Sequence, residues 1–281
     1  MGRKEARATN GVGMRRLVVA FALIMLASGA FAADFEIPTL RGSSPFVPVP
    51  PVYFRWNGVY FGGQGGYSNA RADFGSEAKL ALNFLVPAPF GVPAQAMAGP
   101  IKLLADNRAG PNFGGFAGYN WQFDDAIIGI EGTYSHANLA TASAATAVAK
   151  ILVSGNSIPS TVQLNSSLHL VDYATIRGRG GWAIGSFLPY AMVGVAVGRA
   201  NVSDSAAATI NNCDPVNGFC GSATFTKNDL LSYGYTAGFG IDWMLTSFAF
   251  LRGEYEYVKF VHFGDRPVTV NSVHGAIGFK F

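Results

Sequence analysis

Charged residues are scarce in this chain: they make up 13% of its 281 residues, whereas ordinary globular domains contain about 25%. The scarcity does not indicate disorder, because 49% of the residues are hydrophobic and disordered segments are poor in such residues. The 35 glycines follow no three-residue period, which excludes a collagen helix. The composition is that of a chain apolar enough for a membrane and rich in glycine.

Long hydrophobic runs are missing after residue 32. Glycine or a charged residue interrupts every later apolar stretch well before the roughly 18 residues that indicate a transmembrane helix. The mature chain therefore does not have the sequence of a helical membrane protein.

Cysteine is nearly absent: the chain contains only Cys213 and Cys220. Six residues separate them in a segment that contains Asn, Pro and Gly, so in an exported protein the pair can close a small loop as a disulfide. A zinc site is the alternative, but the spacing is wrong and no histidine lies nearby. The sequence therefore predicts a disulfide and no metal site.

Residues 1–32 have the features of a secretory signal peptide. Basic residues precede an apolar run at 17–26, and Ala30-Phe31-Ala32 supplies a cleavage site. The run is shorter than the about 20 apolar residues of a membrane-spanning helix, which is the alternative. We expect the mature chain to begin at Ala33, with translation starting at residue 1 or 14.

The positive charge of the chain lies mostly in this leader. Residues 1–32 carry a net charge of +4 and the whole chain +3, so the mature part is close to −1. Binding to nucleic acid depends on a basic surface, and we therefore expect no nucleic-acid partner.

The mature chain divides into a linker and one domain. Residues 33–53 contain five prolines and predict an extended periplasmic linker. Residues 54–281 hold eight segments that are rich in Gly, Tyr, Phe and Val. These segments are 54–68, 112–122, 126–137, 167–183, 187–201, 230–244, 248–262 and 270–281.

Side chains in these segments alternate with a period of two, which predicts β-strands. One parity is apolar, as in Tyr233, Tyr235, Ala237, Phe239, Ile241 and Trp243, and the other holds mostly small or polar residues. The second set has too little charge to cover a surface in water, so the apolar set must face lipid and the small set a narrow lumen. The predicted fold is all-β, an eight-stranded antiparallel up-and-down transmembrane β-barrel over residues 54–281.

Short and long connections alternate along the barrel, as in outer-membrane proteins. Short periplasmic turns are expected between strands two and three, four and five, and six and seven. Long external loops are expected at 69–111, 138–166 and 202–229, and Ala140–Val153 could form a short helix. An even number of strands places both ends of the domain in the periplasm.

Several different motifs follow one another along the chain in an order that is typical of one protein family. They are Trp56-Asn-Gly-Val-Tyr-Phe-Gly-Gly-Gln-Gly-Gly-Tyr67, Gly114-Gly-Phe-Ala-Gly-Tyr-Asn-Trp121, Thr175-Ile-Arg-Gly-Arg-Gly-Gly-Trp182 and a terminal Phe281. Over about residues 33–281 the chain resembles the porin-like outer-membrane immunogenic proteins of alphaproteobacteria, which are small OmpA-type barrels.

The resemblance implies an abundant surface barrel in the outer membrane, and some relatives bind haemin. Phe281 looks like the signal that the barrel assembly machinery reads. The long first two loops and the cysteine pair depart from the family, so partners at the surface do not carry over.

Seven charged side chains point into the lumen by parity: Glu131, Arg177, Arg179, Asp242, Arg252, Glu254 and Glu256. They could form an ion pathway or an acid–base pair, or a network of paired charges that holds the barrel together. The interior of an eight-stranded barrel is just filled by side chains, and buried charges need partners. The structural network is therefore the favoured interpretation.

Three histidines fall at the predicted external rim: His136, His169 and His262. Imidazoles near one rim could bind haem iron. Parity directs His136 outward and His169 inward if no bulge intervenes, and the strand of His262 lies across the barrel. Solvated rim histidines are therefore the simpler interpretation.

Aromatic residues predict two interfacial girdles: Trp56, Trp121, Trp182, Trp243, Tyr134, Tyr255 and Tyr257. The tryptophans at 121, 182 and 243 stand beside short turns and are expected to mark the periplasmic girdle.

Enzyme motifs are missing: the chain has no G-x-S-x-G, H-E-x-x-H, P-loop or complete G-x-G-x-x-G sequence. Outer-membrane enzymes can carry a few catalytic residues at the rim, for which Ser167, His169 and Asp172 are weak candidates.

The sequence thus favours a structural outer-membrane barrel without an open channel, without enzymatic activity and without a cofactor. Its expected partners are outer-membrane lipid, the barrel assembly machinery, and host or environmental ligands that contact the loops. The alternatives are haemin or small-ligand binding at the rim, a narrow pore, and a rim-active enzyme.

Overall fold

The computed structural model describes residues 54–74, 103–153, 156–216, 219–263 and 266–281. The expected signal peptide at 1–32 and linker at 33–53 lie outside these residues. In the part of the chain that the structure describes, no helix has the length and hydropathy to span a membrane.

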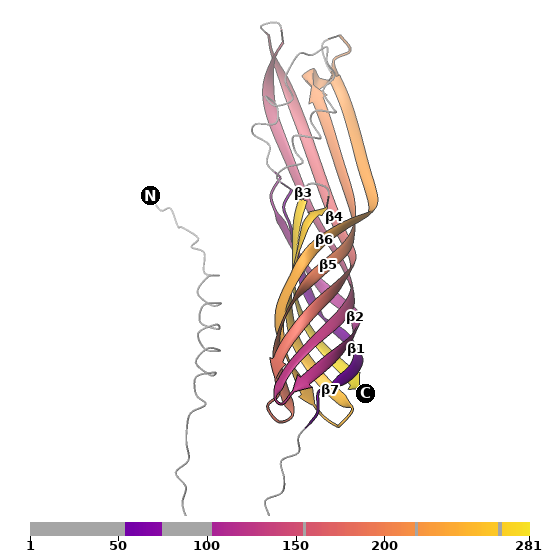
Figure 1. Ribbon diagram of the computed structural model, residues 1–281. Coiled ribbons are helices and arrows are strands. Elements are labelled where there is room, and N and C mark those ends of the chain that lie inside the picture. Colours follow the sequence, from indigo (N-terminus) through magenta and orange to yellow (C-terminus); the bar gives the residue numbers. More distant parts are fainter. Residues whose placement is uncertain (1–53, 75–102, 154–155, 217–218, 264–265) are drawn as a thin grey trace, which may run out of the picture. The chain divides into compact units, whose positions relative to one another are not determined.

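The described residues of the domain form a closed barrel (Figure 1), in which every strand is antiparallel to both neighbours and β1 pairs with β8. The strands are β1 (Gly58–Ala72), β2 (Asp106–Phe123), β3 (Ala126–Val153), β4 (Asn156–Trp182), β5 (Phe187–Ile210), β6 (Phe219–Met244), β7 (Ala249–Phe263) and β8 (Arg266–Lys280). The predicted all-β antiparallel barrel is confirmed.

Between the short turns and the bulges described below, the wall of the barrel is apolar outside and polar inside. On β5, Val193, Val195 and Val197 are exposed, and on the facing part of β4, Arg177 and Arg179 are buried. Successive side chains of a strand point to opposite faces, so the alternation in the sequence becomes an outer and an inner surface.

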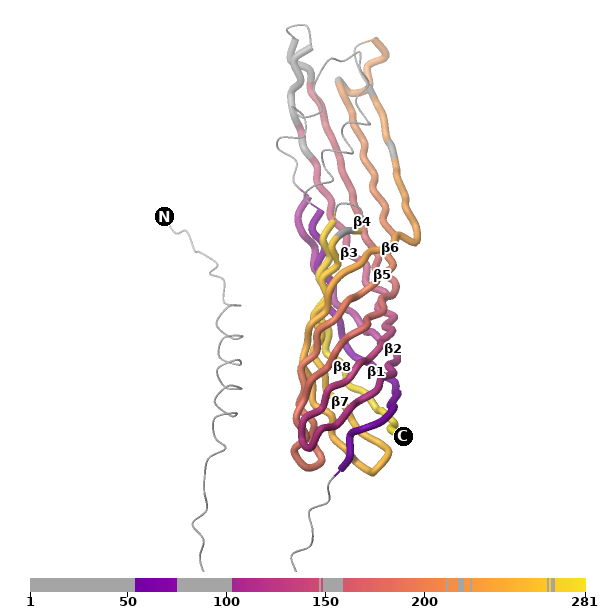
Figure 2. Tube along the Cα trace, in the orientation of Figure 1, coloured from indigo at the N-terminus to yellow at the C-terminus, as the bar shows by residue number. Residues whose placement is uncertain are grey.

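Four strands are much longer than predicted. β3, β4, β5 and β6 continue past the end of the other strands as a four-stranded sheet, which we call the extension (Figure 2). The loops expected at 138–166 and 202–229 are therefore mostly strand, and the helix considered for Ala140–Val153 is wrong.

The burial pattern and the strand pairing explain why residues 138–166 form strands and not a loop or a helix. On β4, Val162, Leu164, Leu168 and Leu170 are buried, while the side chains between them are mostly polar and more exposed. This is strand alternation, but the Ala- and Ser-rich partner strand β3 has a low strand propensity. Pairing with β4 along its whole length overrides that propensity.

Bulges lie at one level across the wall. The register shifts between His136 and Leu139, between Leu170 and Asp172, and between Ala200 and Val202. A bulge moves the following side chains to the other face. His169, expected to point inward, therefore lies between the buried Leu168 and Leu170, on the outer face of the extension.

Inside the barrel, large side chains lie directly opposite glycine on the neighbouring strand. Tyr60 pairs with Gly118 and Tyr190 with Gly240. A Cβ atom on either glycine would lie 2.5 Å from the hydroxyl of the facing tyrosine. The inner glycines thus make room for the rings that fill the lumen.

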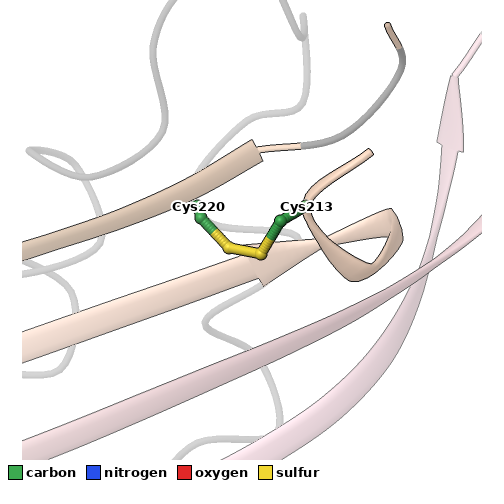
Figure 3. Close-up of a disulfide and its surroundings, with 2 residues drawn as sticks. All are labelled: Cys213 and Cys220. Carbon is green, nitrogen blue, oxygen red and sulfur yellow. A yellow bond between two sulfur atoms is a disulfide. The ribbon is translucent and has the colours of Figure 1, made fainter. Parts of the chain in front are cut away.

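The cysteine pair closes the tip of the extension. A disulfide joins Cys213, at the end of the 3-10 helix η2 (Asn211–Cys213), to Cys220 near the start of β6 (Figure 3).

The inner glycines provide a test of this packing. In Gly194→Val, the new Cβ would lie 2.6 Å from the Cα of Arg177 on the facing strand. Overpacking of this kind costs about 1–3 kcal/mol or more, so we expect the urea midpoint of the refolded barrel to fall. Gly178→Val is the matched control, because the nearest atom to its Cβ is 3.9 Å away. Equal midpoints for the two variants would contradict this account.

Candidate functional site

The seven charged side chains that parity directs inward lie in the interior of the barrel. Each of them is 4% exposed or less. They come from β3 (Glu131), β4 (Arg177 and Arg179), β6 (Asp242) and β7 (Arg252, Glu254 and Glu256). The structure brings all seven together in one network of hydrogen bonds and ion pairs.

Arg177 is bound by three carboxylates. Its Nε donates to Oε1 of Glu131 at 2.9 Å, its Nη1 to Oε1 of Glu256 at 3.1 Å, and its Nη2 to Oε2 of Glu254 at 2.9 Å. One guanidinium therefore connects β4 with β3 and β7 across the lumen.

Glu131 is in turn bound by three arginines. Besides Arg177, Nη1 of Arg252 donates to its Oε2 at 2.7 Å, and Nη1 of Arg179 lies 3.4 Å from the same oxygen. Asp242 completes the network by accepting from Nη2 of Arg179 at 2.6 Å and from Nε of Arg252 at 2.8 Å. Charge-assisted bonds of this kind offset the cost of removing each charge from water.

Tyrosine hydroxyls also donate hydrogen bonds to three of these carboxylates. Tyr60 donates to Glu131 at 2.8 Å, Tyr190 to Glu254 at 2.6 Å, and Tyr173 to Glu256 at 3.3 Å. The guanidinium of Arg179 also stacks 3.8 Å over the ring of Tyr190. The tyrosines that face the inner glycines are thus part of the charge network.

One buried member escaped the sequence analysis. His274 on β8 is buried, its Nε2 lies 2.8 Å from Nδ2 of Asn112, and its Nδ1 lies 3.9 Å from Oε1 of Glu254. Its parity on the last strand is that of the inward-facing residues, and this alternation is the signal in the sequence that predicts its burial. His274 therefore adds a buried imidazole next to Glu254, at the border of the charge network.

Apolar clusters lie on both sides of the network along the barrel. At the end with short turns, Trp56, Phe116, Leu188, Met244 and Phe250 form a buried cluster. At the other end a second cluster contains Phe74, Leu168, Leu170, Phe260, Phe263 and Val268. The interior is therefore built as three layers: apolar, charged and apolar.

Trp56 does not belong to a girdle, contrary to expectation. It is only 1% exposed, and its ring packs edge-on against Phe250 at 6.1 Å. The backbone explains this position: the Trp56 amide donates to the side chain of Gln122, and its carbonyl accepts from Asn120. The segment before β1 therefore turns into the mouth of the barrel.

The other tryptophans stand on the outer wall beside the short turns. Trp121, Trp182 and Trp243 are between 45% and 57% exposed. Phe281 is also exposed, stacks on Phe61 at 5.5 Å, and donates its amide to the carbonyl of Val59. These rings form an aromatic band at the edge of the apolar wall.

At the opposite edge, outward-facing side chains become polar. Nδ1 of His136 lies 2.6 Å from Oδ1 of Asp172, whose other oxygen accepts from Arg199 at 2.5 Å. Arg199 also reaches Asp229 at 3.4 Å. These four residues, which we call the edge cluster, link β3, β4, β5 and β6 at the level of the bulges.

The rim candidates do not converge on one site. His136 binds Asp172, while His169 lies 2.5 Å from Oδ1 of Asn138 and Ser167 donates to the carbonyl of Ser203. The side chain of His262 lies outside the described residues. Among the residues that the structure describes, no group of three potential metal ligands occurs.

A closed antiparallel barrel with an apolar outer band, an aromatic edge and a charged interior defines the class of transmembrane β-barrel proteins. The sequence matches the family "outer membrane protein beta-barrel domain" over residues 19–281. The chain belongs to this family, and the protein is located in the outer membrane.

Relatives in alphaproteobacteria carry matching descriptions. The 22 kDa outer membrane protein of Rhizobium leguminosarum is 25% identical over 83% of this chain and 82% of its own length. The 31 kDa outer-membrane immunogenic protein of Brucella melitensis is 24% identical over 95% of this chain and 100% of its own length. Among solved structures, Neisserial surface protein A is 13% identical, with a TM-score of 0.36, over 79% of this chain and 97% of that one.

The network predicts a large effect of removing one arginine. Arg177→Met leaves Glu131, Glu254 and Glu256 without the cation that binds all three, and breaking a buried pair costs about 3–5 kcal/mol. We expect a lower urea midpoint and loss of the compact, heat-modifiable band in gel electrophoresis. Arg71→Met on the exposed side of β1 is the control. An unchanged midpoint for Arg177→Met would show that the network does not stabilise the barrel.

Proposed function

We propose that this protein is a sealed structural barrel of the outer membrane, which contributes to envelope integrity and carries an external sheet for contacts. The observation that supports this proposal most directly is the three-layered interior. An eight-stranded barrel has little more space than its own side chains occupy, and here those side chains are bound to one another.

The absence of an open channel is part of this proposal. A pore needs a continuous polar path, but apolar clusters around Phe116 and Phe250 at one end, and around Phe260 and Phe263 at the other, flank the charge network. The arginines and carboxylates bind each other at 2.5–3.4 Å, so their charge is not available to passing ions.

The proposed role involves neither catalysis nor a cofactor. Ser167, His169 and Asp172, which were weak candidates for a rim-active site, each bind a different partner in the structure. This arrangement gives no support to a nucleophile activated by an adjacent base.

The proposed partners follow from the surfaces. Membrane lipid contacts the apolar outer wall, the barrel assembly machinery reads the exposed terminal Phe281, and external ligands meet the extension. The scarcity of charge in the mature chain argues against nucleic acid.

Conductance across a planar bilayer tests the sealed interior. We expect the refolded wild-type barrel to insert without conductance steps, because the charge network and the two apolar clusters fill its lumen. Heat-modifiable mobility of the same preparation verifies that the inserted protein is folded. Uniform conductance steps that scale with the amount of folded protein would contradict the proposal and support a narrow pore.

A further inference from the structure

The apolar outer wall is hollowed on one side by a groove of about 640 Å³ that crosses strands β1 to β4. Its floor consists of outward-facing residues with little or no side chain: Gly115, Ala117, Gly132 and Ala174. The volume lies within the range of about 300–1,000 Å³ that is common for ligand sites. The wall that faces lipid therefore contains a hollow with the size of a binding site.

Strand pairing brings the residues of the floor together. Ala117 pairs with Gly132, while the next outward position of β2, Gly115, pairs with Tyr134, which in turn pairs with Ala174. A Cβ atom on Gly132 would have no atom nearer than 3.9 Å. Unlike the inner glycines that face tyrosine rings, this glycine is therefore not required by packing within the barrel, and the space above it is open.

Large side chains bound the groove. Phe61 on β1 and Ile176 on β4 are exposed and belong to its lining. Tyr134 is exposed as well, and its hydroxyl donates to the carboxylate of Asp172 in the edge cluster. The groove is therefore apolar along its floor and sides and meets a polar group where the wall ends.

The position of the groove along the strands places it in the external half of the wall. On β4, Ala174 is two residues from Asp172 of the edge cluster and eight residues from Trp182 of the aromatic band. A strand advances by about 3.3 Å per residue. A molecule that fills the groove therefore also reaches the edge cluster.

The edge cluster offers charges of both signs to such a molecule. The side chains of Arg199 and Asp229 are 46% and 71% exposed, and their charged atoms lie 3.4 Å apart. Asp172 is bound by His136 and Arg199. Two carboxylates beside one guanidinium disfavour a head group with several phosphates. A zwitterionic head group can instead pair its phosphate with Arg199 and its ammonium with Asp229.

We infer that the groove binds an acyl chain of a zwitterionic phospholipid, whose head group lies at the edge cluster. The occupant has to be apolar along its length and charged at one end, because the floor is apolar and the external end is not. The groove is also continuous with the wall that faces lipid, so lipid has direct access to it. The inference rests on the contact between wall and lipid proposed above, but not on the sealed interior.

Titration with dipalmitoyl phosphatidylethanolamine tests the inference. The probe is added to the isotope-labelled, refolded full-length barrel in deuterated detergent micelles. At one equivalent we expect saturable binding, with nuclear Overhauser contacts from the chain methylenes to the amides of Gly115 and Gly132. The amide of Gly180, which faces outward but does not line the groove, should show none. Contacts spread evenly around the wall without saturation would overturn the inference.

Filling the groove supplies the matched protein variants. Gly132→Leu should weaken binding of the phospholipid by about tenfold or more, since extra methylenes in an apolar site discriminate by this factor. Gly180→Leu is the control, because an added Cβ there meets nothing within 4 Å. Both variants should keep the heat-modifiable mobility of the barrel. Equal affinities of the two folded variants would contradict the site.

The head group is tested separately from the chain. Arg199→Met should weaken binding of the phospholipid several-fold but leave binding of dipalmitoylglycerol, which lacks phosphate and ammonium, unchanged. Arg71→Met is the control, because this exposed arginine lies outside the edge cluster. An equal effect of Arg199→Met on both probes would overturn the assignment of the head group.

Two further outcomes would assign the groove to another occupant and overturn the inference. Tighter binding of lipid A than of the phospholipid would identify a site for a phosphorylated glycolipid. Shifts of the Gly115 and Gly132 amides that grow with protein concentration in the absence of lipid would identify a second copy of the chain. Neither outcome would affect the conductance test of the sealed interior.

Discussion

Burial of charge is the constraint on which the rest of this structure depends. A carboxylate or guanidinium inside a narrow barrel is stable only if opposite charges and hydrogen bonds replace the water it has lost. Glu131 meets this requirement by binding Arg177, Arg179 and Arg252 at once. Because these residues come from strands on different sides of the lumen, satisfying the charges also fixes how the strands are placed around it.

The same constraint explains the unusual composition of the chain. Outer positions face lipid and exclude charge, so the few charged residues of the strands concentrate inside or beyond the apolar wall. Inner positions must also hold tyrosine rings that bind the carboxylates, and glycines such as Gly118 and Gly240 provide the space opposite these rings. Scarce charge and abundant glycine are therefore two consequences of one narrow, filled interior.

Alternation in the sequence was sufficient to locate the barrel and its inner charges, because no bulge interrupts the strands between the short turns and Arg177. Alternation alone predicts that His169 points inward. The bulge next to Leu170 reverses the faces of the strand there, so His169 lies on the outer face. Local propensity also failed for Ala140–Val153, where pairing with β4 decides the conformation. Trp56 was misplaced because its burial depends on backbone contacts with Asn120 and Gln122, which are distant in sequence.

The central claim is that Arg177 and Glu131 stabilise the barrel through their contact with each other. A double-mutant cycle with Arg177→Met, Glu131→Gln and the combined variant, followed by urea unfolding in micelles, measures this coupling directly. The account predicts a coupling of about 0.5–3 kcal/mol, the range for residues that share one hydrogen-bond and salt-bridge network. Additive effects of the two substitutions would contradict it.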